Sequence, residues 1–171
     1  MSKIYDCITF FDDNFLANLR FEILNKTVDY FVVCESKFDH KNRKKKLNFK
    51  LINKNFKKKL IYLVLDYPFK KKDNPWQNQA YQRDYMLRKL KNIGQNDYVM
   101  FSDPDEIPNP KILKNFKLMK KYGIFMQKMY CYKFNLFNHF ESPWEGTRVC
   151  RKKDLFSIDY MRQKILKKNL Q

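Results

Sequence analysis

The sequence has few of the residues that break regular structure. Its 171 residues include only 3 glycines and 6 prolines, which leaves little room for linkers or low-complexity spacers. No internal repeat occurs and no change in composition marks an interior boundary, so we expect one domain over residues 1–171. Hydrophobic residues make up 44% and aromatic residues 17% of the chain, which excludes a disordered protein.

Paired cysteines and long apolar runs are also missing. Cys7, Cys34, Cys131 and Cys150 lie far apart, and no CxxC or Cys/His pair has the spacing of a metal site, which argues against structural zinc. We expect reduced core cysteines in a cytoplasmic protein. The N-terminus lacks the apolar run of a signal peptide. A run of about 18 apolar residues occurs nowhere, so the sequence predicts no membrane span.

Acidic residues are scarce relative to basic ones. The chain has 18 Asp and Glu against 36 Lys and Arg, which gives a formal net charge of +18. This excess favours polyanionic partners: nucleic acids, anionic lipids or nucleotide phosphates. Lysine supplies most of it, with 29 lysines against 7 arginines, whereas proteins that read bases depend on arginine.

A basic nucleic-acid-binding module is one alternative that follows from this charge. Its footprint would be the lysines of residues 41–72 and 152–168, with Phe49, Phe56 and Phe69 available to stack on bases. The lysines are, however, widely dispersed, and no known reader motif occurs. We therefore expect no specific nucleic-acid partner and leave peripheral contact with an anionic membrane open.

Apolar runs alternate with helix signals along the chain. Strands are predicted at about residues 4–11, 28–34, 60–65, 97–102, 124–136 and 147–151. Helices are predicted at about residues 14–25, 47–57, 74–92 and 110–121, and after residue 154. This order predicts an α/β fold with a mostly parallel sheet and helices on both faces.

The fourth predicted strand ends in the acidic turn Asp103-Pro104-Asp105-Glu106. In α/β sheets ligands bind at the carboxyl ends of the strands, and two carboxylates one residue apart can approach one Mg²⁺ or Mn²⁺ ion. A local reversal of charge in so basic a chain supports this interpretation. The alternative is that these residues cap the turn or the next helix, which is the more common role of an isolated D-x-D.

Several stretches together resemble glycosyltransferase family 17. They are IYDCITFFDDNFLANLR, VDYFVVCESKF, YQRDYM, FSDPDEIP and PWEGTRV, and their order and spacing hold over residues 3–155. That family contains the β-1,4-N-acetylglucosaminyltransferases that add the bisecting GlcNAc to N-glycans, with many bacterial and viral relatives. Each motif alone is weak, but together in this order they are specific.

The resemblance implies a GT-A-like (Rossmann-like) fold and a divalent metal, usually Mn²⁺ and otherwise Mg²⁺, held by a D-x-D motif. Asp103 and Asp105 would be its carboxylates, with Asp103 also facing the donor, a nucleotide sugar that the family suggests is UDP-GlcNAc. Transfer in the family inverts the anomeric centre, so a carboxylate should deprotonate the acceptor hydroxyl. The acceptor would be a glycan or a glycolipid.

The resemblance also suggests donor-binding residues. Phe10, Phe11 and Asp12, after the first strand, would meet the nucleobase and ribose. Arg20 and Arg83 match family arginines that could pair with the diphosphate, or they are surface or helix-packing arginines. Glu35 matches a family Glu-Ser pair, and could instead be a structural carboxylate bonded to the helix that contains Arg83.

This sequence departs from the family pattern in several places. Relatives continue into a late segment with glycine and histidine that closes the site, and His40 and His139 are not in such a motif. Residues 41–46 carry lysines where relatives have glycine and proline. No general base is assigned; Glu106, Glu141 and Glu145 are the candidates. We therefore expect either a minimal active transferase or a C-terminally shortened, inert remnant.

Overall fold

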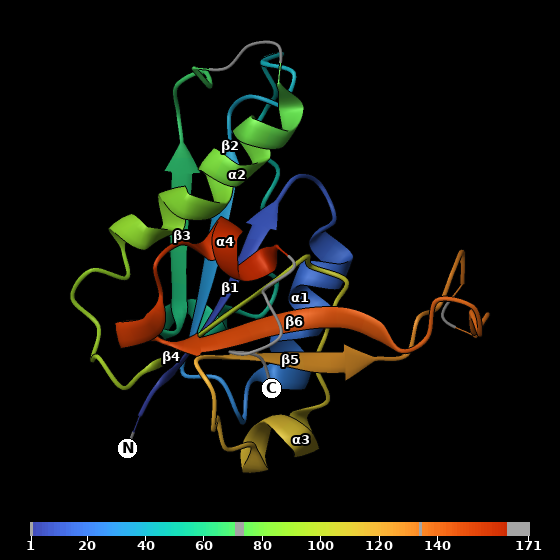
Figure 1. The fold of residues 1–171 in the computed structure, drawn as a ribbon. Coiled ribbons are helices and arrows are strands. Elements are labelled where there is room, and N and C mark those ends of the chain that lie inside the picture. The colour runs from blue at the N-terminus through green and yellow to red at the C-terminus, as the bar shows by residue number, and fades with distance from the viewer. Residues whose placement is uncertain (1, 71–73, 134, 164–171) are drawn as a thin grey trace.

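The computed structural model describes residues 2–70, 74–133 and 135–163. Within these residues six strands form one sheet in the order β3-β2-β1-β4-β6-β5 (Figure 1). Their bounds are β1 Ile4–Phe10, β2 Tyr30–Ser36, β3 Leu60–Leu65, β4 Tyr98–Ser102, β5 Tyr122–Gln127 and β6 Trp144–Arg151. Neighbours among β3, β2, β1 and β4 are parallel, whereas β6 is antiparallel to both β4 and β5. The predicted α/β fold with a mostly parallel sheet is confirmed.

Helices cover both faces of this sheet (Figure 1). They are α1 Asn14–Leu24, α2 Pro75–Tyr85, α3 Pro110–Asn115 and α4 Ile158–Arg162, with short 3-10 helices at Lys54–Lys58, Met86–Arg88 and Lys152–Asp154. Asp13 caps α1 by accepting from the Leu16 N–H, and Asn74 caps α2 in the same way through the Gln77 N–H. These side chains satisfy backbone donors that a helix start leaves unpaired.

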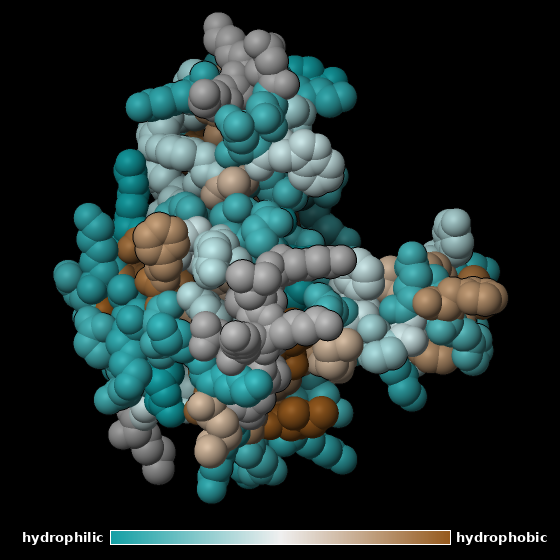
Figure 2. Space-filling model, in the orientation of Figure 1, coloured by the Kyte–Doolittle hydropathy of each residue, from teal (hydrophilic) through white to brown (hydrophobic). Residues whose placement is uncertain are grey.

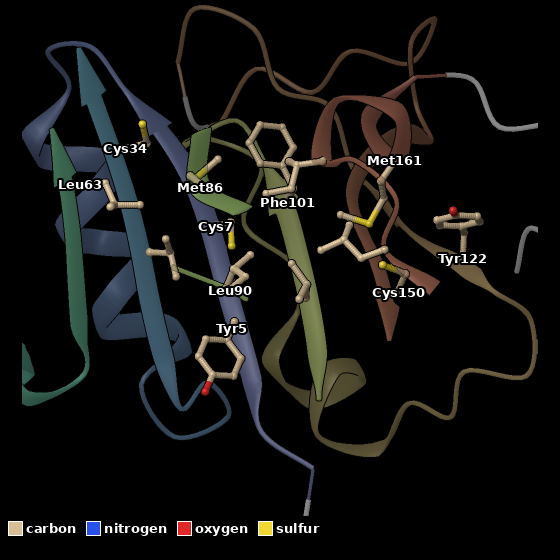
Figure 3. Close-up of a cluster of buried hydrophobic side chains, with 14 residues drawn as sticks. Tyr5, Cys7, Cys34, Leu63, Met86, Leu90, Phe101, Tyr122, Cys150 and Met161 are labelled. Atoms are coloured by element: carbon tan, nitrogen blue, oxygen red, sulfur yellow. The ribbon is translucent and has the colours of Figure 1, made fainter. Parts of the chain in front are cut away.

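A separate hydrophobic core lies on each face of the sheet. One core joins the strands to α2 and α4 and includes Cys7, Cys34, Phe101, Cys150 and Met161 (Figure 3). The other joins the opposite face to α1 and α3 through Phe21, Phe31 and Leu113, among others. Parallel strands buried on both faces explain why their sequences are nearly continuous apolar runs. None of the four cysteines forms a disulfide, and three of them are buried.

Three predicted elements are shorter in the structure. The helix predicted over residues 74–92 ends at Tyr85 and is followed only by the 3-10 turn Met86–Arg88. α3 ends at Asn115 because Phe116 turns into extended backbone and its ring packs between Tyr98 and Phe125. β5 ends at Gln127 because its partner β6 begins at Trp144, the residue paired with Gln127. A strand cannot continue without a partner for its backbone groups.

The predicted helix at residues 47–57 is also reduced, to the 3-10 turn Lys54–Lys58. The chain before that turn is extended instead, and its backbone bonds to side chains: Asn14 accepts from the Lys50 N–H at 2.7 Å, and Asn18 accepts from the Ile52 N–H at 2.8 Å. Tertiary hydrogen bonds therefore replace the helical ones. Over the described ranges, no helix is long and apolar enough to cross a membrane.

The described residues between β5 and β6, 128–133 and 135–143, leave the sheet and project from the body of the protein; we refer to them as the arm (Figure 1). An isolated bridge between Tyr130 and Phe137 ties its two sides together. Apolar side chains gather on this projection (Figure 2). Tyr132 and Phe140 are fully exposed, at 101% and 102%.

Candidate active site

The site lies where the order of the strands reverses. β1 and β4 are adjacent and parallel, so both end at the same edge of the sheet. The chain leaves β1 for α1 on one face, and α2, which leads into β4, covers the other face. Such a switch point opens a crevice at the carboxyl edge of the sheet. Residues 11–13 after β1 and 103–105 after β4 meet there.

A cavity of about 540 Å³ occupies this crevice. The structure brings five of the predicted site residues together in its wall: Phe10, Phe11, Asp12, Asp103 and Asp105. Asp105 is exposed, and the side chain of Asp103 is 38% exposed. Both carboxylates are therefore open to a ligand in the cavity.

Another part of the wall is a basic hairpin, residues 37–45, whose Lys45 Nζ lies 5.4 Å from the centre of the Phe11 ring. The Lys45 N–H donates to the Lys37 carbonyl at 2.8 Å, and Phe38 pairs with Lys44. Its tip is fixed by Asn42, whose amide accepts from the Phe69 N–H at 2.7 Å and donates to the Phe69 carbonyl at 3.0 Å. The hairpin presents His40, Lys41, Arg43 and Lys45 to the cavity. This wall contains the lysine run of residues 41–46, except for Lys46.

Glu35 lies beneath this wall, fully buried, and does not line the cavity. It accepts from Lys45 Nζ at 2.7 Å, from the Tyr62 hydroxyl at 2.7 Å and from the Asn48 and Phe49 N–H groups. Burial alone would raise the pKa of Glu35, but these hydrogen bonds outweigh it and hold the pKa below its ordinary value. Its contacts come from the hairpin, the segment after it and β3, and it acts on the cavity through Lys45.

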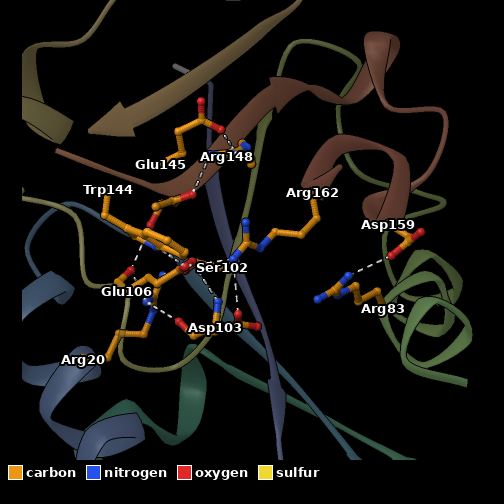
Figure 4. Close-up of polar contacts among 12 residues, drawn as sticks. Arg20, Arg83, Ser102, Asp103, Glu106, Trp144, Glu145, Arg148, Asp159 and Arg162 are labelled. Carbon is orange, nitrogen blue, oxygen red and sulfur yellow. Dashed lines mark hydrogen bonds and ion pairs between the residues drawn. The ribbon is translucent and has the colours of Figure 1, made fainter. Parts of the chain in front are cut away.

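Arg20 lies under the acidic turn, with no exposed surface. Its Nε and Nη2 donate to the two carboxylate oxygens of Asp6, both at 2.7 Å. Nη2 also donates to Ser102 Oγ at 2.7 Å, and Nη1 donates to the Glu106 carbonyl at 2.8 Å (Figure 4). The guanidinium thus ties β1, the end of β4 and the turn into one unit, and it does not border the cavity.

Arg83 also faces the protein. It lies on α2 and donates to Asp159 on α4 at 2.9 Å (Figure 4). Its guanidinium also lies over the Phe101 ring, 5.4 Å from the ring centre. It is 7% exposed. The side chains that α2 presents to the cavity are instead Gln79 and Gln82.

Glu106 connects three parts of the site (Figure 4). One oxygen, Oε1, accepts from Trp144 Nε1 at 2.7 Å and from Arg162 Nη2 at 2.8 Å, and Oε2 accepts from the Asp103 N–H at 3.2 Å. Arg162 also lies 3.3 Å from Asp103 Oδ2. Burial raises the pKa of Glu106, partly offset by the Trp144 hydrogen bond and the Arg162 charge.

The other two candidate bases lie elsewhere. Glu145 is on β6 and pairs with Arg148 at 3.0 Å (Figure 4). Glu141 is on the arm and accepts from Asn138 Nδ2 at 3.2 Å. Neither lines the cavity between β1 and β4 or the second cavity described next, whereas Glu106 lines the second one.

A second cavity, of about 730 Å³, adjoins the first. The two share Leu16, Asp103 and Asp105, and the second is bounded further by Glu106, Trp144 and the arm. Sequence reasoning did not place Trp144, Arg162 or the arm at the site. The stretch PWEGTRV contains Trp144 and was the one signal for it.

No group of three or more His, Cys, Asp or Glu side chains in the described residues is arranged to hold a metal ion. The pair Asp103 and Asp105 nevertheless suits a hard divalent cation, because oxygen ligands open to a cavity can share such an ion with substrate phosphates. A metal here would thus need ligands from the substrate. The carboxylate oxygens of Asp103 and Asp105 are metal ligands that fit this arrangement.

Comparison with solved structures returned a crystal structure of a glycosyltransferase involved in the glycosylation of the major capsid of PBCV-1. The alignment has a TM-score of 0.41 and 12% sequence identity, and covers 90% of this chain and 61% of that one. The chain thus spans less than two thirds of that protein. Among curated proteins, no match was found.

A family model gives the stronger result. The model of glycosyltransferase family 17 matches residues 1–166. The match therefore includes the loop after β1, the acidic turn and Trp144, which all line one or both of the two cavities. On this match, the chain belongs to glycosyltransferase family 17.

Proposed function

We propose that this chain is a metal-dependent, inverting glycosyltransferase whose nucleotide-sugar donor, UDP-GlcNAc, binds in the cavity between β1 and β4. The observation that carries the proposal is that cavity itself: the residues after β1 and the Asp103–Asp105 pair line the same space. Family membership supplies the class of reaction. The acceptor would be a glycan or a glycolipid.

The charge of the cavity supports a bound cation. Its wall contains the carboxylates of Asp12, Asp13, Asp39, Asp103 and Asp105 against the cations Lys41, Arg43 and Lys45. Negative groups are thus in excess here, although the chain as a whole is strongly basic. The two negative charges of the donor's diphosphate would add to this negative excess. Asp103 and Asp105 would hold Mn²⁺ or Mg²⁺, which neutralises charge on the leaving diphosphate when bound.

The chain's own residues have distinct parts in this proposal. Phe10, Phe11 and Asp12 would form the surface for the nucleoside, and the hairpin cations Arg43 and Lys45 would face the phosphates beside it. Arg20 holds the acidic turn in place from below. Because its donors are engaged by protein acceptors, it positions the carboxylates and does not bind the ligand.

Inversion requires a group that accepts the proton of the attacking hydroxyl. Of the three candidate glutamates, Glu106 fits best because it borders the second cavity beside Asp103 and Asp105. Its raised pKa makes it a stronger base than an ordinary carboxylate. Its contacts with Trp144 and Arg162 keep the carboxylate in place.

Titration calorimetry with UDP and Mn²⁺ tests the donor site. We expect the wild type to bind UDP in a Mn²⁺-dependent manner, and Asp103→Asn and Asp105→Asn each to lose most of that affinity. Asp66→Asn is the control, since Asp66 is an exposed carboxylate outside the cavity. Wild-type affinity for UDP in all three variants would disprove the proposed role of the acidic turn.

A further inference from the structure

We propose that the second cavity is the acceptor subsite, in which a saccharide packs against Trp144, Tyr130 and Tyr132. The inference rests on the proposed function, because an acceptor is needed only if the first cavity holds a sugar donor. The arm, which sequence reasoning read as a continuation of a strand, becomes a substrate-binding element.

The position of the cavity is the first argument. A transferred sugar passes from donor to acceptor at one point, so the two substrates must meet where their sites join. The two cavities share Asp103 and Asp105. A ligand in the second cavity therefore approaches the same carboxylates as the donor, and Glu106 lies in the wall on its side.

The rigidity of Trp144 is the second argument. Its indole N–H donates to Glu106 at 2.7 Å, and its backbone pairs with Gln127 at the end of the β5–β6 ladder. Gln127 also lines the cavity, and its buried Nε2 has no hydrogen-bond partner in the part of the chain that the structure describes. A fixed aromatic ring beside a buried polar group without a hydrogen-bond partner is typical of a ligand site.

The arm provides the third argument. Tyr132 is completely exposed and has a φ of 65°, a backbone conformation that large side chains rarely adopt. Tyr130 lies beside it, with its ring 5.6 Å from that of Phe137. The backbone thus holds two tyrosines at the cavity without burying either in the protein core.

The mixed chemistry of the wall favours a sugar over a purely apolar ligand. Aromatic side chains lie on the arm side, and Asp103, Asp105 and Glu106 lie at the inner end. A pyranose ring has an apolar face of C–H groups and a rim of hydroxyl groups. The rings can pack on that face while the carboxylates accept from the hydroxyls.

Trp144 itself provides the readout. The chain has two tryptophans, and Trp76 is 80% exposed on α2, so Trp76→Phe leaves Trp144 as the single tryptophan. This protein would be titrated with chito-, manno-, cello- and xylo-oligosaccharides, with and without UDP and Mn²⁺. We expect at least one of them to shift the Trp144 emission to shorter wavelength in a saturable manner.

A matched pair of variants assigns the binding to the cavity. Tyr132→Ala should weaken saccharide binding about tenfold. Phe140→Ala should leave it unchanged, because Phe140 is equally exposed on the same arm but does not line the cavity. Both side chains are exposed, so both variants should fold, which circular dichroism verifies.

The outcomes separate the two proposals. If UDP binds but no saccharide shifts the emission, or if both variants weaken binding equally, the acceptor subsite is wrong and the donor site stands. If phosphatidylserine vesicles, and not saccharides, shift the Trp144 emission, the acceptor subsite is also wrong and the arm contacts a membrane instead. If UDP itself does not bind, the failure belongs to the proposed function.

Discussion

Arg20 and Asp6 form a buried ion pair at the centre of the molecule. Two nitrogens of the arginine donate to the two oxygens of the carboxylate, each at 2.7 Å, and the side chains are 0% and 1% exposed. The same guanidinium also donates to Ser102 and to the carbonyl of Glu106. The ion pair therefore holds the acidic turn in position.

Removal of Arg20 should therefore be costly. In Arg20→Ala, Asp6 is left buried without its partner, and we expect the free energy of unfolding to fall by about 3–5 kcal/mol. Urea unfolding followed by circular dichroism measures this. The control is Arg43→Ala: the Arg43 side chain is 76% exposed, so its ion pair with Asp39 should contribute less than about 1 kcal/mol. Native stability with lost UDP affinity in Arg20→Ala would instead place this arginine at the ligand.

Glu106 should make stability fall as the pH rises. Burial raises its pKa in the folded state, so its contribution is complete below the ordinary value of 4.5 and is lost as the pH passes the higher folded value. We expect Glu106→Gln to gain stability relative to the wild type between about pH 4 and pH 7. Urea unfolding at several pH values tests this, and a difference that does not vary with pH contradicts it.

Glu35 should behave in the opposite way. Its folded-state pKa is lowered, so its contribution is present above 4.5 and is lost as the pH falls through the lower folded value. We expect Glu35→Gln to cost about 1–3 kcal/mol near neutral pH, with the deficit shrinking in acid. The same unfolding series measures it, and a deficit that grows towards acid would show that the hydrogen bonds do not favour the ionised form.

The tip of the basic hairpin should depend on both the backbone and the side chain of Asn42. Asn42 has a φ of 62° and makes two hydrogen bonds to Phe69. Asn42→Gly removes the bonds but retains the backbone freedom, whereas Asn42→Ala loses both, so the alanine variant should be less stable than the glycine variant by about 1 kcal/mol. Thermal unfolding gives the order, and equal stabilities would mean that the φ value is not a constraint.

Arg162 should compete with a divalent cation for Asp103. Its guanidinium lies 3.3 Å from Asp103 Oδ2, so Arg162→Gln removes a positive charge from the carboxylate that would hold the metal. We expect Mn²⁺ affinity without UDP to rise about threefold. Arg151→Gln is the control, because Arg151 lies at the C-terminal end of β6, where it stacks on Tyr98. Weaker Mn²⁺ binding in Arg162→Gln would show that the arginine supports the site.

The sheet and the acidic turn could be predicted from the sequence because both follow local rules. Strands buried on two faces are apolar runs, and helix caps such as Asn74 precede their helices. Asp103 and Asp105 interrupt the basic character of the chain at the end of such a strand. Element type and order, and the edge at which the loops meet, follow from these patterns.

The partners of buried charges could not be predicted in the same way. Arg20 on a helix is typical of a surface residue, and its role depends on Asp6, which lies inside the apolar run of β1. A carboxylate within such a run does signal a buried partner, although it does not identify it. The arm illustrates a second limit: its aromatic residues have strand propensity, but the lack of a pairing strand ends β5 at Gln127.

The basic hairpin and the arm have in common that both connect strands without belonging to the sheet. The side chains they offer to the two cavities can therefore change without altering either hydrophobic core. Lys45, which pairs with the buried Glu35, and Asn42, which fixes the tip of the hairpin, are the exceptions, because both also support the fold. Substitutions at the other cavity-lining positions of residues 37–45 and of the arm would therefore change the walls of the two cavities while the sheet and the Arg20–Asp6 pair stay as they are.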